Sequence, residues 1–411
     1  MTENTATENT GATRRLARRR AAERRFRLYG MAAVGAALAL LALILGGIAA
    51  DGVSAFRQAE VRLPVTFEAA AVDGGDYGVL IKRALKSLFP EVRGRKAKRA
   101  LYALASQGAA RELRRMLLAD PDIEDTTREV WLPASDDVDM FVKGEASGRI
   151  KADQATWIAA LADDGRIEQR FNARFFTAGD SREPELAGIL GATVGSLLTL
   201  VITFAVAFPL GVGAAVYLEE FAPRNRLTDL IEVSINNLAA VPSIVFGLFG
   251  LAVFLNLGGL PRSAPLVGGL VLALMTLPTV VIAGRAALGA VPGSIREAAL
   301  GLGASRARAV AHHVLPLAMP GVLTGAIIGM ARALGETAPL LMIGMVAFVV
   351  DIPTGPGDAA TALPVQIFLW ADAPERAFVE RAAAAILVLL AFLAAMNLAA
   401  VVLRRRWERR F

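Results

Sequence analysis

Arg332 and Glu336 stand four residues apart in the stretch ARALGETAPLL, inside a run that is otherwise small and apolar. An arginine at the centre of a membrane helix costs roughly 2.5–3.5 kcal/mol on insertion scales, so it needs a reason to be there. At a spacing of one helical turn the two side chains can form an ion pair. Two roles are open: a buried pair that fixes helix register, or an arginine that meets an anion while the glutamate competes for it.

A second group of candidate residues lies in VPGSIREAALGLGASRARAVAHHVLPLAMPG. Ser294 and Glu297 have the spacing of a capping box and predict the start of a short amphipathic helix. Gly303 can end this helix in a left-handed conformation, and Ser305 can cap a second helix that stops before Pro316. The segment is therefore predicted to form a helix, a turn and a helix.

Apolar runs supply the helices that must position these residues. Six of them are about 20 residues or longer, the length of a membrane span, at about 28–50, 187–217, 230–256, 266–290, 320–350 and 379–403. The flanks RRLARRRAAERRFR and RRRWERRF are strongly basic, which places both termini in the cytoplasm under the positive-inside rule. The 291–319 loop then lies inside. The first run is longer than a signal-peptide core, so we expect a retained anchor.

The predicted organisation has five parts. Residues 1–27 form a basic cytoplasmic tail, 28–50 the first transmembrane helix, 51–186 an extracytoplasmic domain, 187–403 a core with five transmembrane helices, and 404–411 a basic tail. The fold class is an all-α polytopic membrane protein of six transmembrane helices with an α/β or α-rich insertion. Within the insertion, GVLIKRALKSLF, GRKAKRALYALASQGAARELRRMLLAD and KADQATWIAALADD favour helices, and TREVWLPA and VDMFVKGEA favour strands.

Composition excludes several kinds of chemistry. Cysteine is absent and the only two histidines, His312 and His313, are adjacent, so neither disulfides nor a metal site is expected. There is no G-x-x-x-x-G-K-[ST] sequence, so the chain is not expected to bind nucleotide through a P-loop. No nucleophile–base set or carboxylate pair suggests an enzyme, and the insertion is interpreted as structural or partner-contacting.

The 291–319 loop resembles the EAA signature of ABC importer permeases, because Glu297-Ala298-Ala299 is followed by Gly303 and then by Leu315-Pro316. In that family the short helix docks in a groove of the ATPase subunit. The resemblance implies a coupling loop built from Ser294, Arg296, Glu297, Ala298, Ala299, Gly303, Leu315 and Pro316.

Longer stretches are similar to the PstA family, permease subunits of the phosphate-specific ABC importer. They include FFTAGDSREPELAGILGATVGSLL, GVGAAVYLEEFAPRNRLTDLIEVSINNLAAVPSIVFGLFGLAVF and ARALGETAPLLMIG, within residues 170–403. The resemblance implies a type I importer fold in the bacterial inner membrane. It also implies four kinds of partner: a PstC-like second permease, a PstB-like ATPase homodimer that uses ATP and Mg²⁺, a PstS-like periplasmic phosphate-binding protein, and phosphate itself. No cofactor and no nucleic acid are expected on this chain, whose remaining contacts are with lipid.

The same resemblance suggests Arg332, Glu336 and Thr337 as residues of the substrate path. Arg285, near the internal end of its span, is a weaker candidate that could also be an ordinary snorkelling arginine. Permeases for sulfate, molybdate or a phosphonate remain alternatives, since the EAA loop is silent on substrate. A secondary anion transporter is a further alternative, but it has no reason to carry this loop.

Other residues are given supporting roles. Glu219 and Glu220 are expected to make mainly interfacial contacts at the end of a span. Glycines at 321, 325 and 329, and at 191 and 195, are expected to let helices pack closely. Prolines are expected to kink or start helices at 242, 316 and 320, and Asn236, Asn237 and Ser243 to bond between helices.

Overall fold

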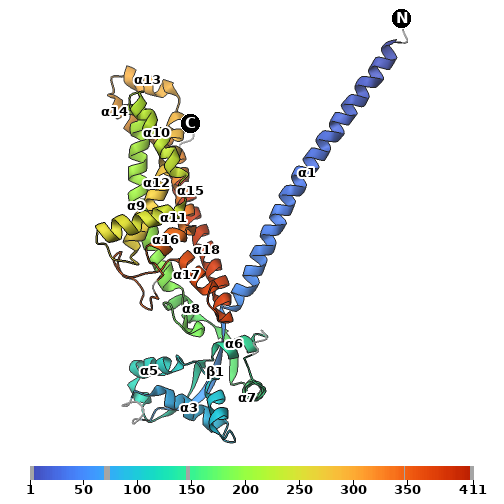
Figure 1. Cartoon of the computed structure of the whole chain (residues 1–411), viewed down its shortest axis with the longest axis vertical. Coiled ribbons are helices and arrows are strands. Elements are labelled where there is room, and N and C mark those ends of the chain that lie inside the picture. Colours follow the sequence, from blue (N-terminus) through green and yellow to red (C-terminus); the bar gives the residue numbers. More distant parts are fainter. Residues whose placement is uncertain (1–3, 69–74, 145–148, 347, 408–411) are drawn as a thin grey trace. The chain divides into compact units, whose positions relative to one another are not determined.

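The computed structural model describes residues 4–68, 75–144, 149–346 and 348–407, and divides into two units. The first unit, residues 1–51, is most of helix α1, Asn4–Ser54. Within α1, Ala22–Ser54 is long and apolar enough to cross a membrane, and the predicted span of 28–50 lies inside it. The second unit, from Gly52 onward, contains a small α/β domain and a helical core (Figure 1).

A three-stranded antiparallel sheet forms the centre of the α/β domain. Strand β1, Arg57–Thr66, lies between β2, Thr127–Pro133, and β3, Ile167–Phe171. Every second residue of β1 points into the core, and Ala59, Val61, Leu63 and Val65 are fully buried. The insertion is therefore α/β, with the predicted strand at β2 confirmed. Strands β1 and β3 were not predicted.

Helices cover this sheet. They are α3, Tyr77–Leu88, α4, Arg95–Tyr102, α5, Ala109–Ala119, α6, Asp136–Val142, and α7, Ala152–Asp163 (Figure 1). The helical predictions are confirmed, although the longest stretch forms two helices, α4 and α5. The predicted strand VDMFVKGEA is wrong, because residues 136–142 form α6. Ser135 stands at its N-cap and three aspartates occupy its first turn, where negative charge favours a helix.

Short elements lead from the domain into the core. They are α8, Ala173–Thr177, and a 3₁₀ turn, Pro184–Leu186. The core then contains α9, Leu190–Val216, α10, Arg226–Ala239, α11, Ser243–Phe249, α12, Pro265–Gly289, α13, Gly293–Gly301, α14, Arg306–Ala309, α15, Leu315–Gly335, α16, Ala338–Met342, α17, Leu363–Ala371, and α18, Arg376–Trp407. Among the described residues, five helices could span a membrane, or six if the bent pair α10–α11 counts as one span.

Prolines change two of the predicted spans. The third is not straight, because α10 and α11 meet at 103° beside Pro242, where a bend was expected. The fifth was predicted to reach residue 350, and this is wrong: α15 ends at Gly335. Pro339 has no N–H to bond the carbonyl of Gly335, and its ring would crowd that carbonyl, which favours a helix end here.

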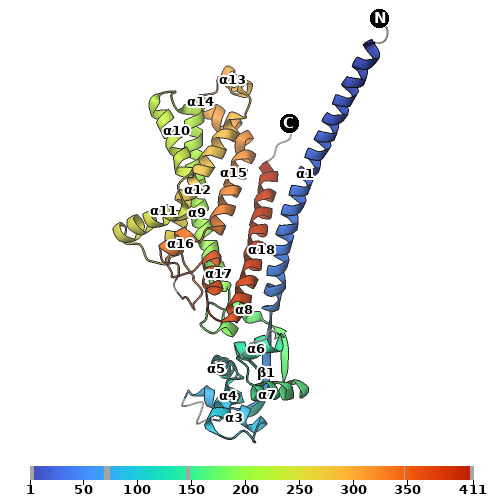
Figure 2. The ribbon, with the colours of Figure 1, turned by 45° about the vertical axis from the view of Figure 1, so that its right-hand side comes forward.

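Helix α12 lies against both α9 and α15 (Figure 2). On α15, a Cβ placed at Gly325 would come within 2.1 Å of the Ala283 Cβ, and one at Gly321 within 2.7 Å of the Ala287 Cβ. Gly329 meets Thr276 in the same way. The predicted glycine face of the fifth span is therefore confirmed as a close packing surface within the chain.

A buried lysine joins the α/β domain to the first turns of α18. The Nζ atom of Lys143 lies 2.8 Å from Asp139 Oδ2 and 2.7 Å from Glu380 Oε1. All three side chains are at most 10% exposed. The neighbouring Arg381 donates from Nη1 to the carbonyl oxygen of Ala187 at 3.0 Å. The domain is thus attached to the sixth span through charged groups on both sides.

Candidate functional site

Arg332 and Glu336 form the predicted ion pair, across the end of a helix. Arg332 lies in the last turn of α15, and Glu336 is the first residue after it, with an extended backbone. The Nε atom of Arg332 is 3.5 Å from Glu336 Oε1. The arginine side chain is 54% exposed and the glutamate side chain 19%, so the pair is not buried within this chain. Thr337 follows directly and stands at the N-cap of α16.

The coupling loop starts differently from the prediction. Pro292 occupies the N-cap of α13, the helix begins at Gly293, and no side chain caps it. The predicted capping box of Ser294 and Glu297 is therefore wrong. Because Pro292 takes the cap position, Ser294 falls inside the first turn, and its side chain makes no cap hydrogen bond.

The end of α13 confirms the prediction. Gly303 has a φ of 87°, the left-handed conformation that favours glycine. Its N–H donates to the carbonyl of Leu300, and the N–H of Ala304 donates to that of Ala299. Ser305 then caps α14 by accepting from the Arg308 N–H.

The second helix of the loop does not stop before Pro316, contrary to the prediction. A π turn, Val310–Val314, joins α14 to α15, and the Leu315 N–H donates to the carbonyl of Val310, five residues back. This wider turn accommodates the missing donor of the proline that follows. The coupling loop is therefore continuous with the span that carries Arg332.

An exposed surface remains on α13. Glu297 and Ala298 are exposed, whereas Ala299 is buried against the core. Leu302, just past the helix, is 91% exposed, and Leu300 is also exposed. Glu297 and the two exposed leucines together form a surface that can dock in an apolar groove.

Arg296 points away from that surface. Its guanidinium donates to both carboxylate oxygens of Glu220, with Nη2 2.6 Å from Oε1. It also donates to the carbonyl oxygens of Leu288 and Val291, at 2.8 and 2.7 Å. The bond to Glu220 raises the pKa of the Arg296 guanidinium. Glu220 is 5% exposed, so the prediction of a mainly interfacial contact is wrong for this residue.

Arg285 is also paired with carboxylates. Its Nε lies 3.3 Å from Glu219 Oε2 and its Nη2 lies 2.7 Å from Glu232 Oε1. These contacts join α12 to α10 and to the π turn Tyr217–Phe221 that follows α9. Gly321 and Gly325 of α15 face residues 287 and 283 of α12, so Arg285 lies beside this part of α15. Along the axis of α15 this is roughly two helical turns from Arg332. The structure does not bring the two arginines together.

Sequence reasoning missed the partners of both arginines. The sequence did contain a signal for these ion pairs. Two adjacent glutamates stand at the end of one span, and two arginines without an assigned partner stand at the end of another span and in the loop.

Asn236 and Asn237 are exposed on α10, and within the described chain their side chains make no hydrogen bond. The interhelical bonds predicted for them are not made among the described residues.

Comparison with known proteins agrees with this geometry. Residues 207–411 match the model for a binding-protein-dependent transport system inner membrane component, and residues 13–152 match a domain of unknown function, DUF3333. The helical core and its coupling loop thus define a membrane component of an ABC transporter. The Phosphate transport system permease protein PstA 1 of Mycobacterium tuberculosis (strain ATCC 25618 / H37Rv) is 36% identical over 217 residues, 53% of this chain and 70% of that protein. The chain belongs to the PstA family of permeases.

Two further similarities are more limited. The probable ABC transporter permease protein YqgI of Bacillus subtilis (strain 168) is 40% identical over 169 residues, 41% of this chain. The alignment spans 57% of the length of YqgI. A solved structure of the inward-facing MetNI methionine ABC transporter aligns with 52% of this chain and 95% of its own, at 18% identity and a TM-score of 0.43.

Proposed function

We propose that the chain is the permease subunit of an ATP-driven importer that moves inorganic phosphate into the cytoplasm. The observation that carries this is the 36% identity to a protein named as a phosphate transport permease, across most of that protein's length. The exposed α13 surface at the end of α12 supports it. The permease itself is not an enzyme, and a partner would hydrolyse ATP with Mg²⁺.

The proposed assembly contains a PstC-like second permease, a PstB-like ATPase homodimer and a PstS-like phosphate-binding protein. Similarity to proteins named PstC supports the first of these. The ATPase would dock on Glu297, Leu300 and Leu302, because these side chains are exposed on and just after α13. Both termini would be cytoplasmic and the α/β domain would lie outside the membrane, as the basic flanks indicate.

Phosphate entry needs an energy source. Moving one negative charge inward against about 100 mV costs roughly 2.3 kcal/mol, and a divalent phosphate needs about twice as much. Arg332 would compensate the lost hydration of the anion, and Glu336 would compete for the guanidinium so that phosphate is released. Their 3.5 Å separation in the structure corresponds to the proposed resting pair. Thr337 lies beside the pair and can donate a hydroxyl.

Proteoliposomes containing the assembled complex and the binding protein test the proposal. We expect phosphate uptake that requires ATP, and no comparable uptake of sulfate, molybdate or a phosphonate. Stimulation of ATPase activity by one of those oxyanions, but not by phosphate, would identify a permease of another oxyanion. Uptake that persists without the ATPase subunit would identify a secondary transporter.

A further inference from the structure

The α/β domain contains a pocket that the transport function does not use. It has a volume of about 540 Å³ and lies between α3, the α4–α5 connection, the start of α6 and the segment 183–185. Small-molecule sites generally have volumes of 300–1,000 Å³. The pocket is therefore large enough for a small organic ligand.

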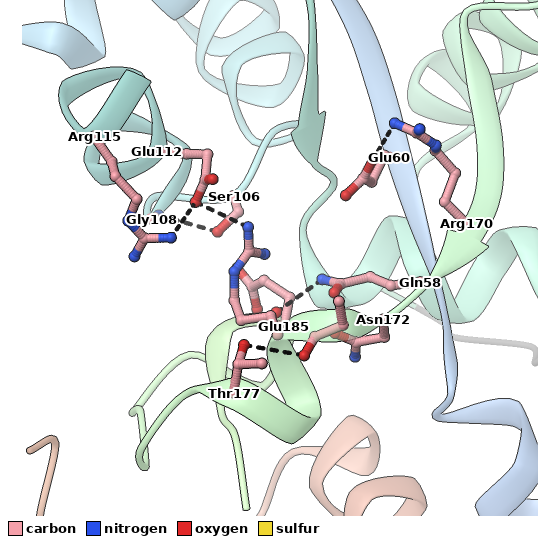
Figure 3. A network of polar contacts seen from close by, with 12 residues as sticks. Gln58, Glu60, Ser106, Gly108, Glu112, Arg115, Arg170, Asn172, Thr177 and Glu185 are labelled. Atoms are coloured by element: carbon pink, nitrogen blue, oxygen red, sulfur yellow. Dashed lines mark hydrogen bonds and ion pairs between the residues drawn. The ribbon is translucent and has the colours of Figure 1, made fainter. Parts of the chain in front are cut away.

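Glu185 is the most deeply placed acid in this pocket. It is 3% exposed, and in the described part of the chain its Oε2 atom has no hydrogen-bond partner. Its main-chain carbonyl is held by the Gln58 side chain at 2.9 Å, which fixes the residue against β1 (Figure 3). Burial raises the pKa of its carboxyl to about 7, against the opposing effect of the Ser106 hydroxyl. A buried carboxylate oxygen without a donor is costly, and the cost falls when a positive charge approaches the carboxyl group.

Other carboxylates add to the negative charge. Asp136, Asp137 and Glu183 line the same pocket and are half-buried. Burial and the neighbouring Asp136 raise the pKa of Asp137, whose nearest cation, Arg149, is 3.9 Å away. The buried Arg381 donates to the carbonyl of Ala187 and acts on Glu185 only through its charge. Among the described residues, the four carboxylates of the pocket thus share one ion-pair partner, Arg149.

The outer part has the opposite charge. Lys82 on α3 and Arg99 on α4 line the pocket and are exposed, and the described chain provides no ion-pair partner for either. Lys82 and Arg99 would repel a purely cationic ligand, and Glu185 would repel a purely anionic one. A ligand with both charges satisfies both parts of the pocket.

We propose that this pocket binds a small zwitterion, whose ammonium group bonds to Glu185 and whose anionic group lies between Lys82 and Arg99. No group of three acidic or histidine side chains among the described residues is placed to hold a metal ion, which favours an organic ammonium. Asp136 and Glu183 stabilise the ammonium group by charge, and Ser106 can accept from it. The anionic group is a phosphate or a carboxylate.

The test uses the full chain in lipid nanodiscs, with O-phosphoethanolamine and L-alanine as probes and isothermal titration as the measurement. We expect at least one of the two to bind at millimolar concentration or below, which also identifies the anionic group. Lys82→Gln and Glu185→Gln should each weaken binding by about tenfold or more, the effect of losing one charge-assisted hydrogen bond.

Matched controls separate the pocket from general charge effects. Lys86→Gln removes the same charge one turn further along α3, outside the pocket, and should leave binding unchanged. Ethylamine and inorganic phosphate, each carrying one of the two charges, should bind at least tenfold more weakly than the best zwitterion. No binding of either zwitterion to the wild-type chain overturns the proposal. So does equal binding to the wild-type and Lys82→Gln chains, or to inorganic phosphate alone. Phosphate uptake is not read in this test.

Discussion

The Nη2 atom of Arg296 lies 2.6 Å from Oε1 of Glu220, so α13 is bonded directly to the π turn Tyr217–Phe221 that follows α9. The same guanidinium holds two carbonyl oxygens at the end of α12. Arg285 forms a second bridge, through Glu219 and Glu232, to α9 and α10. If α13 docks the ATPase as proposed, Arg296 and Arg285 are the contacts through which its displacement would reach the neighbouring helices.

Glu220→Gln should uncouple ATP hydrolysis from transport. The docking surface at Glu297 and Leu302 remains, so ATPase activity of the assembled complex is expected to persist. Breaking one partner of a buried ion pair costs on the order of 3–5 kcal/mol, enough to loosen α13 from α9. We expect the ratio of phosphate imported to ATP hydrolysed to fall by at least about tenfold, which corresponds to 1.4 kcal/mol. Parallel measurement of uptake and ATPase activity gives this ratio.

A second variant separates coupling from assembly. Glu297→Gln alters the exposed surface and should weaken ATPase binding, while the ratio for complexes that do assemble stays normal. An unchanged ratio in Glu220→Gln would show that the bond to Arg296 does not transmit the motion.

Arg332→Gln should lower phosphate uptake by about tenfold or more, because the lost charge-assisted bond is worth roughly 1.5–3 kcal/mol. Glu336→Gln should have the opposite molecular effect, holding phosphate longer and slowing release. Uptake by proteoliposomes and retention of labelled phosphate on the complex measure the two effects. Arg262→Gln, an exposed arginine outside the helices, is the matched control. Near-normal uptake by the assembled Arg332→Gln and double variants would remove the pair from the substrate path.

The stability of the α/β domain should depend on pH through Glu185. Its pKa is about 7 in the folded chain and 4.5 ordinarily, so the folded state binds the proton more tightly. The contribution of Glu185 to the free energy of unfolding is complete below about pH 4.5 and is lost as the pH rises through about 7. The loss amounts to about 3 kcal/mol, because each unit of pKa difference corresponds to 1.36 kcal/mol. Tm should therefore fall less between pH 5 and 8 in Glu185→Gln than in the wild-type chain. Glu124→Gln, which alters an exposed glutamate, should keep the wild-type dependence. Identical curves for all three chains would contradict the buried position of Glu185.

Gly325→Ala should destabilise the contact between α12 and α15. The added Cβ would lie 2.1 Å from that of Ala283, and overpacking of this kind typically costs about 1–3 kcal/mol. At Gly213, also within a helix, a Cβ would have nothing within 4 Å. Gly213→Ala is therefore expected to leave Tm unchanged or raise it, because the helix propensity of alanine adds up to about 1 kcal/mol of stability. Equal Tm values for the two variants would contradict the close approach of the helices.

Local signals predicted the ends of helices well where the side chain or backbone acts on its own neighbours. Gly303 and Ser305 are in the expected conformations, since a left-handed residue and a hydroxyl cap need only a few adjacent atoms. The same reasoning failed at Ser294, where Pro292 had already taken the cap position. It also failed at Pro316, because a π turn absorbed the missing donor.

Contacts between distant segments could not be predicted in this way. Glu220 is bonded to Arg296, which lies 76 residues away along the chain. Strand β3 is short and mostly exposed on both faces, so it has no alternating pattern, and its place beside β1 comes from pairing alone. The pair Arg332–Glu336 was predicted because its members are neighbours in sequence, but the helix end between them depends on Pro339.

The position of Lys143 ties the α/β domain to the membrane core. If the domain were deleted, Glu380 would lose the lysine that pairs with it, and the face of α18 that α6 covers would be uncovered. A relative without the domain has no lysine for a carboxylate at this position to pair with. Residue 380 should therefore record, among relatives, whether the chain carries the domain.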